Sequence, residues 1–316
     1  MSTRIGILRY PGVVGLADMY RAVELSGAVP VTIGYPDTVD AAQGSRNSEK
    51  TTSSSPKTVG ASSLHEVIGT LTALIIPSGM PVEPEFSLPV SILTKEPGSA
   101  TEASTPTTCV SSTAGFASTD SPRIPLLGIG YGFHLLCAAG LLPGDIVWDS
   151  PAPRICRDST LAMDATDTAW THLFAPGEDI VLPVVNASLR YIPPGSLAPT
   201  PKQNTYGQNV PGHNATDGHC TEEIPAYKVV ARFSDLPDAA PGLETALPTP
   251  GTGTTLDKHG ATDAIAAIAN SAGSVLGLLA HPEYAIEAAL GPDTTEGMGL
   301  GIDGQGFFTS ITSARR

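Results

Sequence analysis

A histidine and a carboxylate lie two residues apart near the C-terminal end of this 316-residue chain, in the tripeptide His281-Pro282-Glu283. A histidine beside a carboxylate can move protons during a reaction. An apolar run at 275–279 precedes the tripeptide and predicts a strand, and residues i and i+2 of an extended segment project from one face. The tripeptide also fits a plain strand-to-helix connection in which Pro282 starts the helix.

A second stretch that bears on chemistry is the glycine turn, residues 128–132 (GIGYG). An apolar run at 124–127 precedes it and an apolar helical pattern at 133–142 follows it, which predicts strand, sharp turn and helix. Hydrolases expose a nucleophile on such a turn, beside the partly positive start of the helix. Here the exposed residue is Gly130, which has no side chain to attack with. A dinucleotide fingerprint is not formed, because Phe133 replaces its third glycine.

Residues 128–144 (GIGYGFHLLCAAGLLPG) resemble the corresponding turn of class I glutamine amidotransferases. The resemblance is greatest to the glutaminase subunit of phosphoribosylformylglycinamidine synthase, from purine biosynthesis, which reads approximately G-I-C-N-G-F-Q-I-L-C-E-A-G-L-L-P-G. It continues at 8–12 (LRYPG, family L-R-F-P-G) and at 277–285 (GLLAHPEYA, family G-M-M-P-H-P-E-R-A). It covers nearly the whole chain outside four low-complexity insertions. It implies a class I glutamine amidotransferase-like α/β fold, a flavodoxin-like three-layer sandwich around a mostly parallel sheet.

The resemblance also implies roles for particular residues. His281 would be the catalytic base and Glu283 the carboxylate that orients it. The loop after the strand at 71–76 has Ser78 and Gly79 where the family reads P-G-G-F, a loop whose amides, with that of Tyr131, help form the oxyanion hole. Without the resemblance this loop would be interpreted as a simple turn at the end of a strand.

The chain departs from the family pattern in two places. Gly130 and Tyr131 replace the catalytic cysteine and its neighbour. At 186–191 the chain reads NASLRY where the family reads H-G-E-G-R-Y, so Asn186 and Ser188 alter the active-site rim. A cysteine glutaminase needs a thiolate, a histidine and a carboxylate, so the first of the three is missing.

Neither of two other cysteines is a good substitute for the missing nucleophile. Cys137 lies on the apolar helix after the turn, where the family motif has a second cysteine, and we interpret it as a small buried hydrophobe. Cys109 lies in a polar, low-complexity stretch, which does not provide the preorganisation that a nucleophile needs. His213, His219 and Cys220 are close in sequence but fit no usual metal-ligand spacing, so we expect a solvated loop there and no metal.

The elements that would position these residues follow an α/β pattern. A strand at 5–9, a helix at 18–27 and a strand at 31–33 form a βαβ unit and predict a parallel sheet. Strands at 71–76, 180–185, 227–233 and 265–270, strands around a turn at 154–179 with Trp170 packed inside, and a helix at 284–290 complete the pattern. We expect one domain over 1–316, with low-complexity insertions near 40–63, 95–120, 198–222 and 235–257.

Composition excludes several classes of protein. Seventeen basic and 31 acidic residues give a net charge of −14, which disfavours a nucleic-acid or anionic-membrane surface. No apolar run is long enough to span a bilayer, and the N-terminus lacks the apolar segment of a secretory signal, so we expect a cytoplasmic protein. The four cysteines show no C-x-x-C spacing and are expected to be free thiols. We expect no cofactor.

Three hypotheses about function remain open from the sequence. The first is a degenerate glutaminase that no longer hydrolyses glutamine and acts as a structural or regulatory partner of a synthase subunit, with a glutamine-like small molecule as a further candidate ligand. The second is an enzyme that uses His281 and Glu283 for acid–base chemistry on another substrate. The third is a subunit of a synthase that takes free ammonia.

Overall fold

The computed structural model describes residues 2–34, 67–80, 88, 93, 122–148, 156–185, 189–194, 226–234, 264–288, 291–292 and 301–313. The four predicted insertions (40–63, 95–120, 198–222 and 235–257) lie outside these residues. So do the predicted rim residues Asn186 and Ser188 and the side chains considered at Cys109, His213, His219 and Cys220.

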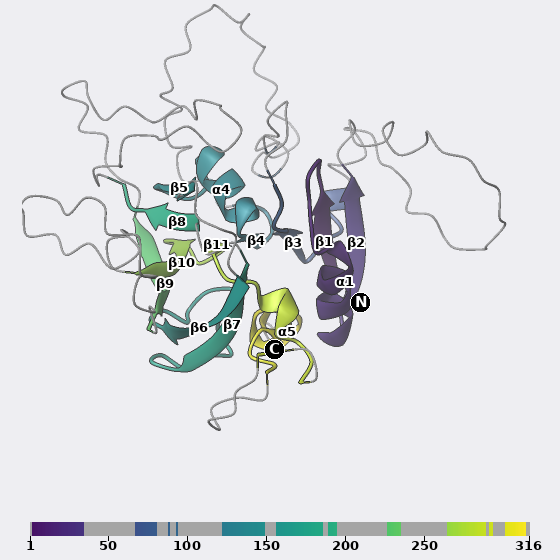
Figure 1. Ribbon diagram of the computed structural model, residues 1–316. Helices are drawn as coiled ribbons and strands as arrows, with labels where there is room; N and C mark the ends of the chain where they lie inside the picture. Colours follow the sequence, from purple (N-terminus) through teal and green to yellow (C-terminus); the bar gives the residue numbers. More distant parts are fainter. Residues whose placement is uncertain are drawn as a thin grey trace, which may run out of the picture.

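Within the described residues, nine strands form one sheet in the order β2-β1-β3-β4-β11-β10-β9-β6-β7 (Figure 1). Their bounds are β1 Arg4–Arg9, β2 Val29–Gly34, β3 Ala73–Ile76, β4 Leu126–Ile129, β6 Cys156–Met163, β7 Asp179–Val185, β9 Tyr227–Phe233, β10 Ile265–Asn270 and β11 Val275–Leu278. Two shorter strands that the sequence did not predict, β5 (Asp145–Trp148) and β8 (Leu189–Ile192), pair antiparallel with each other.

The sheet has a parallel part and an antiparallel part. Strands β2, β1, β3, β4 and β11 are parallel, as the βαβ pattern predicts. From β11 onward, β10, β9, β6 and β7 continue the sheet with antiparallel pairings. A tight turn joins β10 to β11, in which the side chain of Asn270 accepts hydrogen bonds from the N–H groups of Ser274 and Val275. The expected α/β fold is confirmed, and the antiparallel extension is an addition to it.

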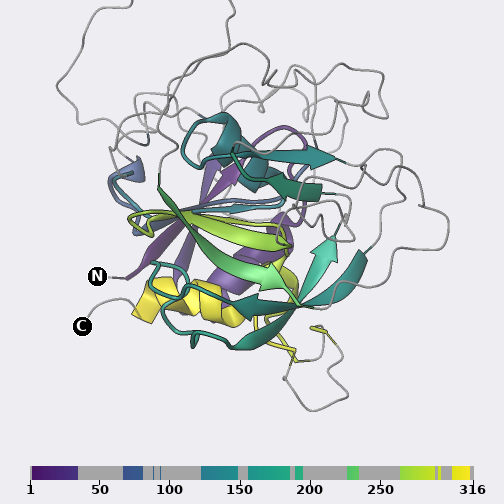
Figure 2. The ribbon, with the colours of Figure 1, turned by 90° about the vertical axis from the view of Figure 1, so that its left-hand side faces the viewer.

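Helices cover both faces of the sheet (Figure 2). The bounds are α1 Leu16–Leu25, α4 Tyr131–Ala138 and α5 Gln305–Ser313, and a short 3-10 turn, η2, covers Pro282–Tyr284. Helix α4 (teal) lies on one face, whereas α1 (purple) and α5 (yellow) lie on the other and contact each other. This layering is the predicted three-layer sandwich. Within the described ranges, no helix combines the length and the apolar character needed to cross a bilayer.

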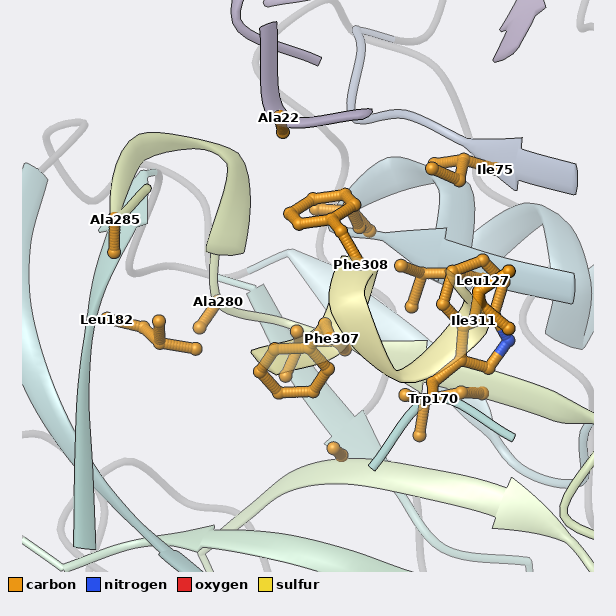
Figure 3. Packing of buried hydrophobic residues seen from close by; sticks show 14 of the residues in the cluster. Ala22, Ile75, Leu127, Trp170, Leu182, Ala280, Ala285, Phe307, Phe308 and Ile311 are labelled. Atoms are coloured by element: carbon orange, nitrogen blue, oxygen red, sulfur yellow. The ribbon is translucent and has the colours of Figure 1, made fainter. Parts of the chain in front are cut away.

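Each face of the sheet carries its own hydrophobic core. On the α1 side, Met19, Ala22 and Val23 are buried at helical spacing. Side chains from α5 complete this core, as Figure 3 shows for Phe307 and Phe308. Trp170 is fully buried in the same cluster, as the sequence predicts. On the α4 side, the core contains Tyr131, Phe133, Leu135, Leu136 and Cys137.

The predicted helix over 284–290 is wrong. Apart from the 3-10 turn η2, the described residues from Ala285 to Ala288 form bends and a turn. A helix would need the Ala285 and Ile286 carbonyls to accept from residues four positions later. Instead, the N–H of Gly304 donates to the Ala285 carbonyl (2.8 Å) and the side chain of Gln305 donates to the Ile286 carbonyl (2.6 Å). These long-range bonds tie the segment to the start of α5, a helix that the sequence did not predict.

Candidate functional site

The glycine turn connects β4 to α4 at the carboxyl end of the parallel strands. Gly130 sits between the two elements with φ 53° and ψ −111°. This backbone conformation is strained for any residue with a Cβ atom, and glycine adopts it without penalty. The Gly130 N–H donates to the carbonyl of Leu278 at 2.8 Å, which places the turn beside the end of β11. The strained conformation typical of a nucleophile-bearing turn is therefore present without the nucleophile.

Gly132 is required for close packing of α4 against β3, and not for an unusual backbone conformation. A Cβ atom on this residue would clash with the carbonyl oxygen of Ile76, at the end of β3. The first turn of α4 thus packs directly against the backbone of β3. Of the glycines at 128–132, only Gly130 has a positive φ. Gly132 serves close packing, whereas the sequence analysis attributed the glycines to the sharp reversal alone.

His281 and Glu283 form a buried pair. The Nδ1 atom of His281 lies 2.9 Å from Oε1 of Glu283, and the two residues are 1% and 2% exposed. The N–H of His281 donates to the carbonyl of Pro183 in β7 (2.8 Å), and its ring stacks on Tyr284 with 5.5 Å between centroids. Glu283 reaches the histidine from the 3-10 turn η2, not from an extended segment as the sequence predicted.

The carboxylate of Glu283 lies close to the start of α1. A Cβ atom on Gly15, the N-cap residue just before this helix, would lie 3.9 Å from Glu283 Oε1 and 2.7 Å from the Tyr284 hydroxyl. The partly positive N-terminus of a helix favours a negative charge nearby. Burial, with Glu283 adding to it, raises the pKa of Tyr284 to about 12. The Tyr284 hydroxyl thus lies in a partly buried position near the carboxylate of Glu283.

The other ring nitrogen of His281 faces the glycine turn. A Cβ atom built on Gly130 would lie 3.5 Å from His281 Nε2. Nε2 is buried and has no hydrogen-bond partner among the described residues, and the same holds for Oε2 of Glu283. General bases in other enzymes are held in this way, through one ring nitrogen with the other directed at the reacting group, and the role of general base for His281 stays a prediction.

The loop after β3, residues 77–80, is fixed by the loop after β1. The Tyr10 hydroxyl donates to the Pro77 carbonyl (2.7 Å), and the Val14 N–H donates to the Ser78 carbonyl (3.0 Å). A Cβ atom on Gly79 would lie 2.6 Å from the Tyr10 hydroxyl, so a larger residue would not fit here. The loop reaches the glycine turn through Ser78, and its role in an oxyanion hole stays a prediction.

The side chain of Ser78 enters the site. Ser78 is 7% exposed, and its Oγ lies 2.5 Å from the position that a Cβ on Gly130 would take. The Tyr131 N–H donates to Ser78 Oγ at 3.5 Å. From the sequence, only the backbone amide of Ser78 was expected to take part in the site. The presence of a serine at a position where the family motif has glycine could have indicated a role for this hydroxyl.

Tyr131 is buried beside the turn. Its ring lies 6.1 Å from that of Tyr10, and it stacks on His134 at 5.4 Å. His134 in turn has Nδ1 3.6 Å from Oδ1 of Asp145. These contacts hold the first turn of α4, and with it the Tyr131 N–H, against the loop after β3.

Cys137 is placed as a structural residue. It is buried in the α4 core, and its Sγ lies 3.9 Å from the Pro143 carbonyl. Burial, with the nearby Asp145 adding to it, raises the pKa of the thiol well above its usual range, so the reactive thiolate is disfavoured. The part of the chain that the structure describes contains no cluster of three or more histidine, cysteine, aspartate or glutamate side chains that could hold a metal ion.

No established family model matches the chain, but individual proteins do. It is 25% identical over 308 residues to "Phosphoribosylformylglycinamidine synthase subunit PurQ" of Leifsonia xyli subsp. xyli, which covers 98% of this chain and 96% of that protein. It is 28% identical over 314 residues to the protein of the same name from Nocardia farcinica, covering 98% and 97%.

Among solved structures, the chain is similar to "Structure of PurLQS from Thermotoga maritima", with a TM-score of 0.52, 20% identity and coverage of 99% of this chain and 98% of that one. The fold is thus the flavodoxin-like α/β fold of class I glutamine amidotransferases. The similarity to PurQ proteins supports the resemblance to glutamine amidotransferases that the sequence indicates.

Proposed function

We propose that this chain is a glutaminase-like subunit that does not hydrolyse glutamine and that acts as a structural or regulatory partner of a synthase subunit. The observation that carries the proposal is the combination at the glycine turn. The backbone of Gly130 keeps the strained conformation of a nucleophile position, and His281 and Glu283 are aligned behind it, but residue 130 has no reactive side chain.

The chemistry of glutamine hydrolysis explains why this loss matters. An amide is a poor electrophile with a poor leaving group, so a cysteine glutaminase depends on a covalent thiolate. Removing a covalent nucleophile leaves only the rate that binding and the oxyanion hole provide. Cys137 does not replace it, because its thiol is buried in the α4 core with a raised pKa. Binding surfaces that are remote from the turn are not affected by the change at Gly130.

The role of a partner rests on the relatives. Similarity to proteins named as subunits of phosphoribosylformylglycinamidine synthase extends over 98% of this chain, and the structural neighbour is described as PurLQS. Similarity of that extent supports a conserved fold with its docking surface, even where catalysis is lost. We therefore place the chain with a synthase-type protein, in purine biosynthesis.

The test uses the full chain with the synthase subunit encoded in the same genome. Glutamate release from glutamine is measured for the chain alone and for the mixture, and complex formation is followed by size-exclusion chromatography. We expect a complex and no glutamate. If the natural protein releases glutamate and His281→Ala abolishes the release, the chain is a glutaminase with another nucleophile. If no complex forms, the partner role is wrong.

A second candidate function is acid–base chemistry on another substrate. The observation that favours it is the open Nε2 of His281, which is buried, oriented by Glu283 and without a partner among the described residues. A purely structural subunit has no need for such a pair.

A further inference from the structure

The hydroxyl of Ser78 lies next to the position of the missing nucleophile. Its Oγ lies 2.5 Å from the position that a Cβ on Gly130 would take, whereas a side chain on residue 130 would extend from that same point. The serine comes from a different element, the loop after β3, and it is 7% exposed. The site thus contains a buried hydroxyl beside the point from which a side chain on residue 130 would extend.

The same point lies 3.5 Å from His281 Nε2. Because Ser78 Oγ and His281 Nε2 lie 2.5 and 3.5 Å from one point, they are at most about 6 Å apart. Nε2 has no hydrogen-bond partner among the described residues, and Nδ1 is held by Glu283 at 2.9 Å. The relay of hydroxyl, imidazole and carboxylate requires the Ser78 side chain to rotate toward Nε2, and a serine has three staggered rotamers for such a movement.

The start of α4 provides a hydrogen-bond donor beside the hydroxyl. The Tyr131 N–H donates to Ser78 Oγ at 3.5 Å, the long end of the hydrogen-bond range. An N–H in the first turn of a helix is directed at negative charge and has no partner within the helix. When the Ser78 hydroxyl turns toward His281, this N–H becomes available to a carbonyl oxygen bound beside the serine, where negative charge would develop during the attack.

We propose that Ser78 is the nucleophile of an acyl-transfer site, with His281 as the general base and Glu283 as its positioning carboxylate. The substrate class is a small carboxylic ester. Ser78 Oγ forms a bond to the carbonyl carbon while its proton passes to His281 Nε2. The ester C–O bond then breaks, and the alcohol leaves with that proton. Water attacks the acyl-serine by the same route, releasing the acid and regenerating the hydroxyl.

This inference does not depend on the partner role proposed above, and it is compatible with the absence of glutamine hydrolysis. An alkoxide leaves a tetrahedral intermediate with less need for protonation than an amine does. A hydroxyl nucleophile with an imperfectly aligned base can therefore act on an ester and still fail on the amide of glutamine.

The test measures covalent labelling and turnover separately from glutamate release. The full-length protein is treated with a fluorophosphonate probe, the labelled peptide is identified by mass spectrometry, and p-nitrophenyl acetate hydrolysis is followed in parallel. We expect the label on Ser78. Ser78→Ala should lose the label and the site-dependent turnover, and His281→Ala should slow both by about 100-fold or more.

Ser310→Ala is the matched control, because Ser310 is also a buried serine but donates to the Gly306 carbonyl within α5. It should label and turn over as the natural protein does. Circular dichroism establishes that each variant is folded. A label elsewhere or no label, together with turnover unchanged in Ser78→Ala, overturns the proposal.

If Ser78→Ala fails to fold, the variant Ser78→Cys provides a second test of the coupling between residue 78 and His281. The introduced thiol should react with iodoacetamide at neutral pH faster in the natural background than in the His281→Ala background, because the histidine takes its proton. Equal alkylation rates in the two backgrounds would show that Ser78 and His281 are not coupled, and would equally overturn the proposal.

Discussion

Ser78 and Gly130 compete for one space: the Oγ of Ser78 lies 2.5 Å from the point where any side chain on residue 130 would begin. Real Cβ atoms do not tolerate so close a neighbour. A side chain on residue 130 therefore requires the Ser78 hydroxyl to turn away, so the serine in the loop after β3 and the glycine in the turn are coupled.

This relationship predicts the result of restoring the cysteine. Gly130→Cys alone should give no glutaminase activity, and the conformation at φ 53° should lower the free energy of unfolding by about 1–3 kcal/mol. Gly130→Cys combined with Ser78→Gly removes the clash and should release glutamate. Glutamate assays and urea unfolding of both variants make the comparison. Equal activity in the single and double variants would contradict this coupling.

Replacement of Glu283 should release the ring of His281. Glu283→Ala leaves the buried Nδ1 without its partner, so the free energy of unfolding should fall by about 1–3 kcal/mol. Glu283→Gln keeps a side-chain oxygen that can accept from Nδ1 and should lose less. Urea unfolding measures the stability, and nitrogen NMR shifts of the imidazole report its tautomer. An unchanged tautomer in Glu283→Ala would indicate that the carboxylate does not orient the ring.

The raised pKa of Tyr284 predicts a pH dependence of stability. Burial is its first cause and raises the pKa to about 12, whereas an unfolded tyrosine ionises near 10. The unfolded state therefore loses its proton first, and stability should fall as the pH rises from about 10 to 12. Tyr284→Phe should make this fall shallower. Denaturation at several pH values gives the free energy of unfolding of both proteins as a function of pH. If this free energy falls equally in both, the raised pKa of Tyr284 is not the cause.

Close packing at the start of α4 can be tested with alanine. Gly132→Ala puts a methyl group against the Ile76 carbonyl, so the free energy of unfolding should fall by about 3 kcal/mol. Gly34→Ala is the control, since nothing lies within 4 Å of a Cβ there and its φ is not in the left-handed range. That control should change stability by less than about 0.5 kcal/mol. Similar losses in both variants would refute the packing argument.

The two described cysteines should differ in reactivity. Cys156 is exposed and should react with a thiol reagent at once, whereas Cys137 is buried with a raised pKa and should react only when the protein unfolds. Mass spectrometry of the labelled peptides separates the two sites. Rapid labelling of Cys137 in native buffer would mean that the α4 core opens. The thiol of Cys137 would then again be a candidate nucleophile.

Strands with continuous apolar runs were predictable from the sequence. The strand predicted at 227–233 coincides with β9, and that at 265–270 coincides with β10. Helix α5 was missed because QGFFTSITS is rich in serine, threonine and other weak helix formers. Burial of Phe307, Phe308 and Ile311 stabilises it instead, and no local pattern reveals that contact.

The candidate site was predictable in part, because His281, Glu283 and Gly130 lie in recognisable motifs. The structure places them together, whereas their catalytic roles stay predictions. The hydroxyl of Ser78 could not be placed from the sequence, because its direction depends on how the loops after β1 and β3 pair. The rim residues Asn186 and Ser188 lie outside the described residues, so their roles also stay predictions.

The bond between the His281 N–H and the Pro183 carbonyl has a consequence for assembly. Strand β7 is at one edge of the nine-stranded sheet, where another chain could add a strand. Pro183 has no N–H to offer such a strand, and its carbonyl is already bonded to His281 at 2.8 Å. The same contact that holds the backbone of His281 therefore makes the middle of this edge unsuited to strand addition.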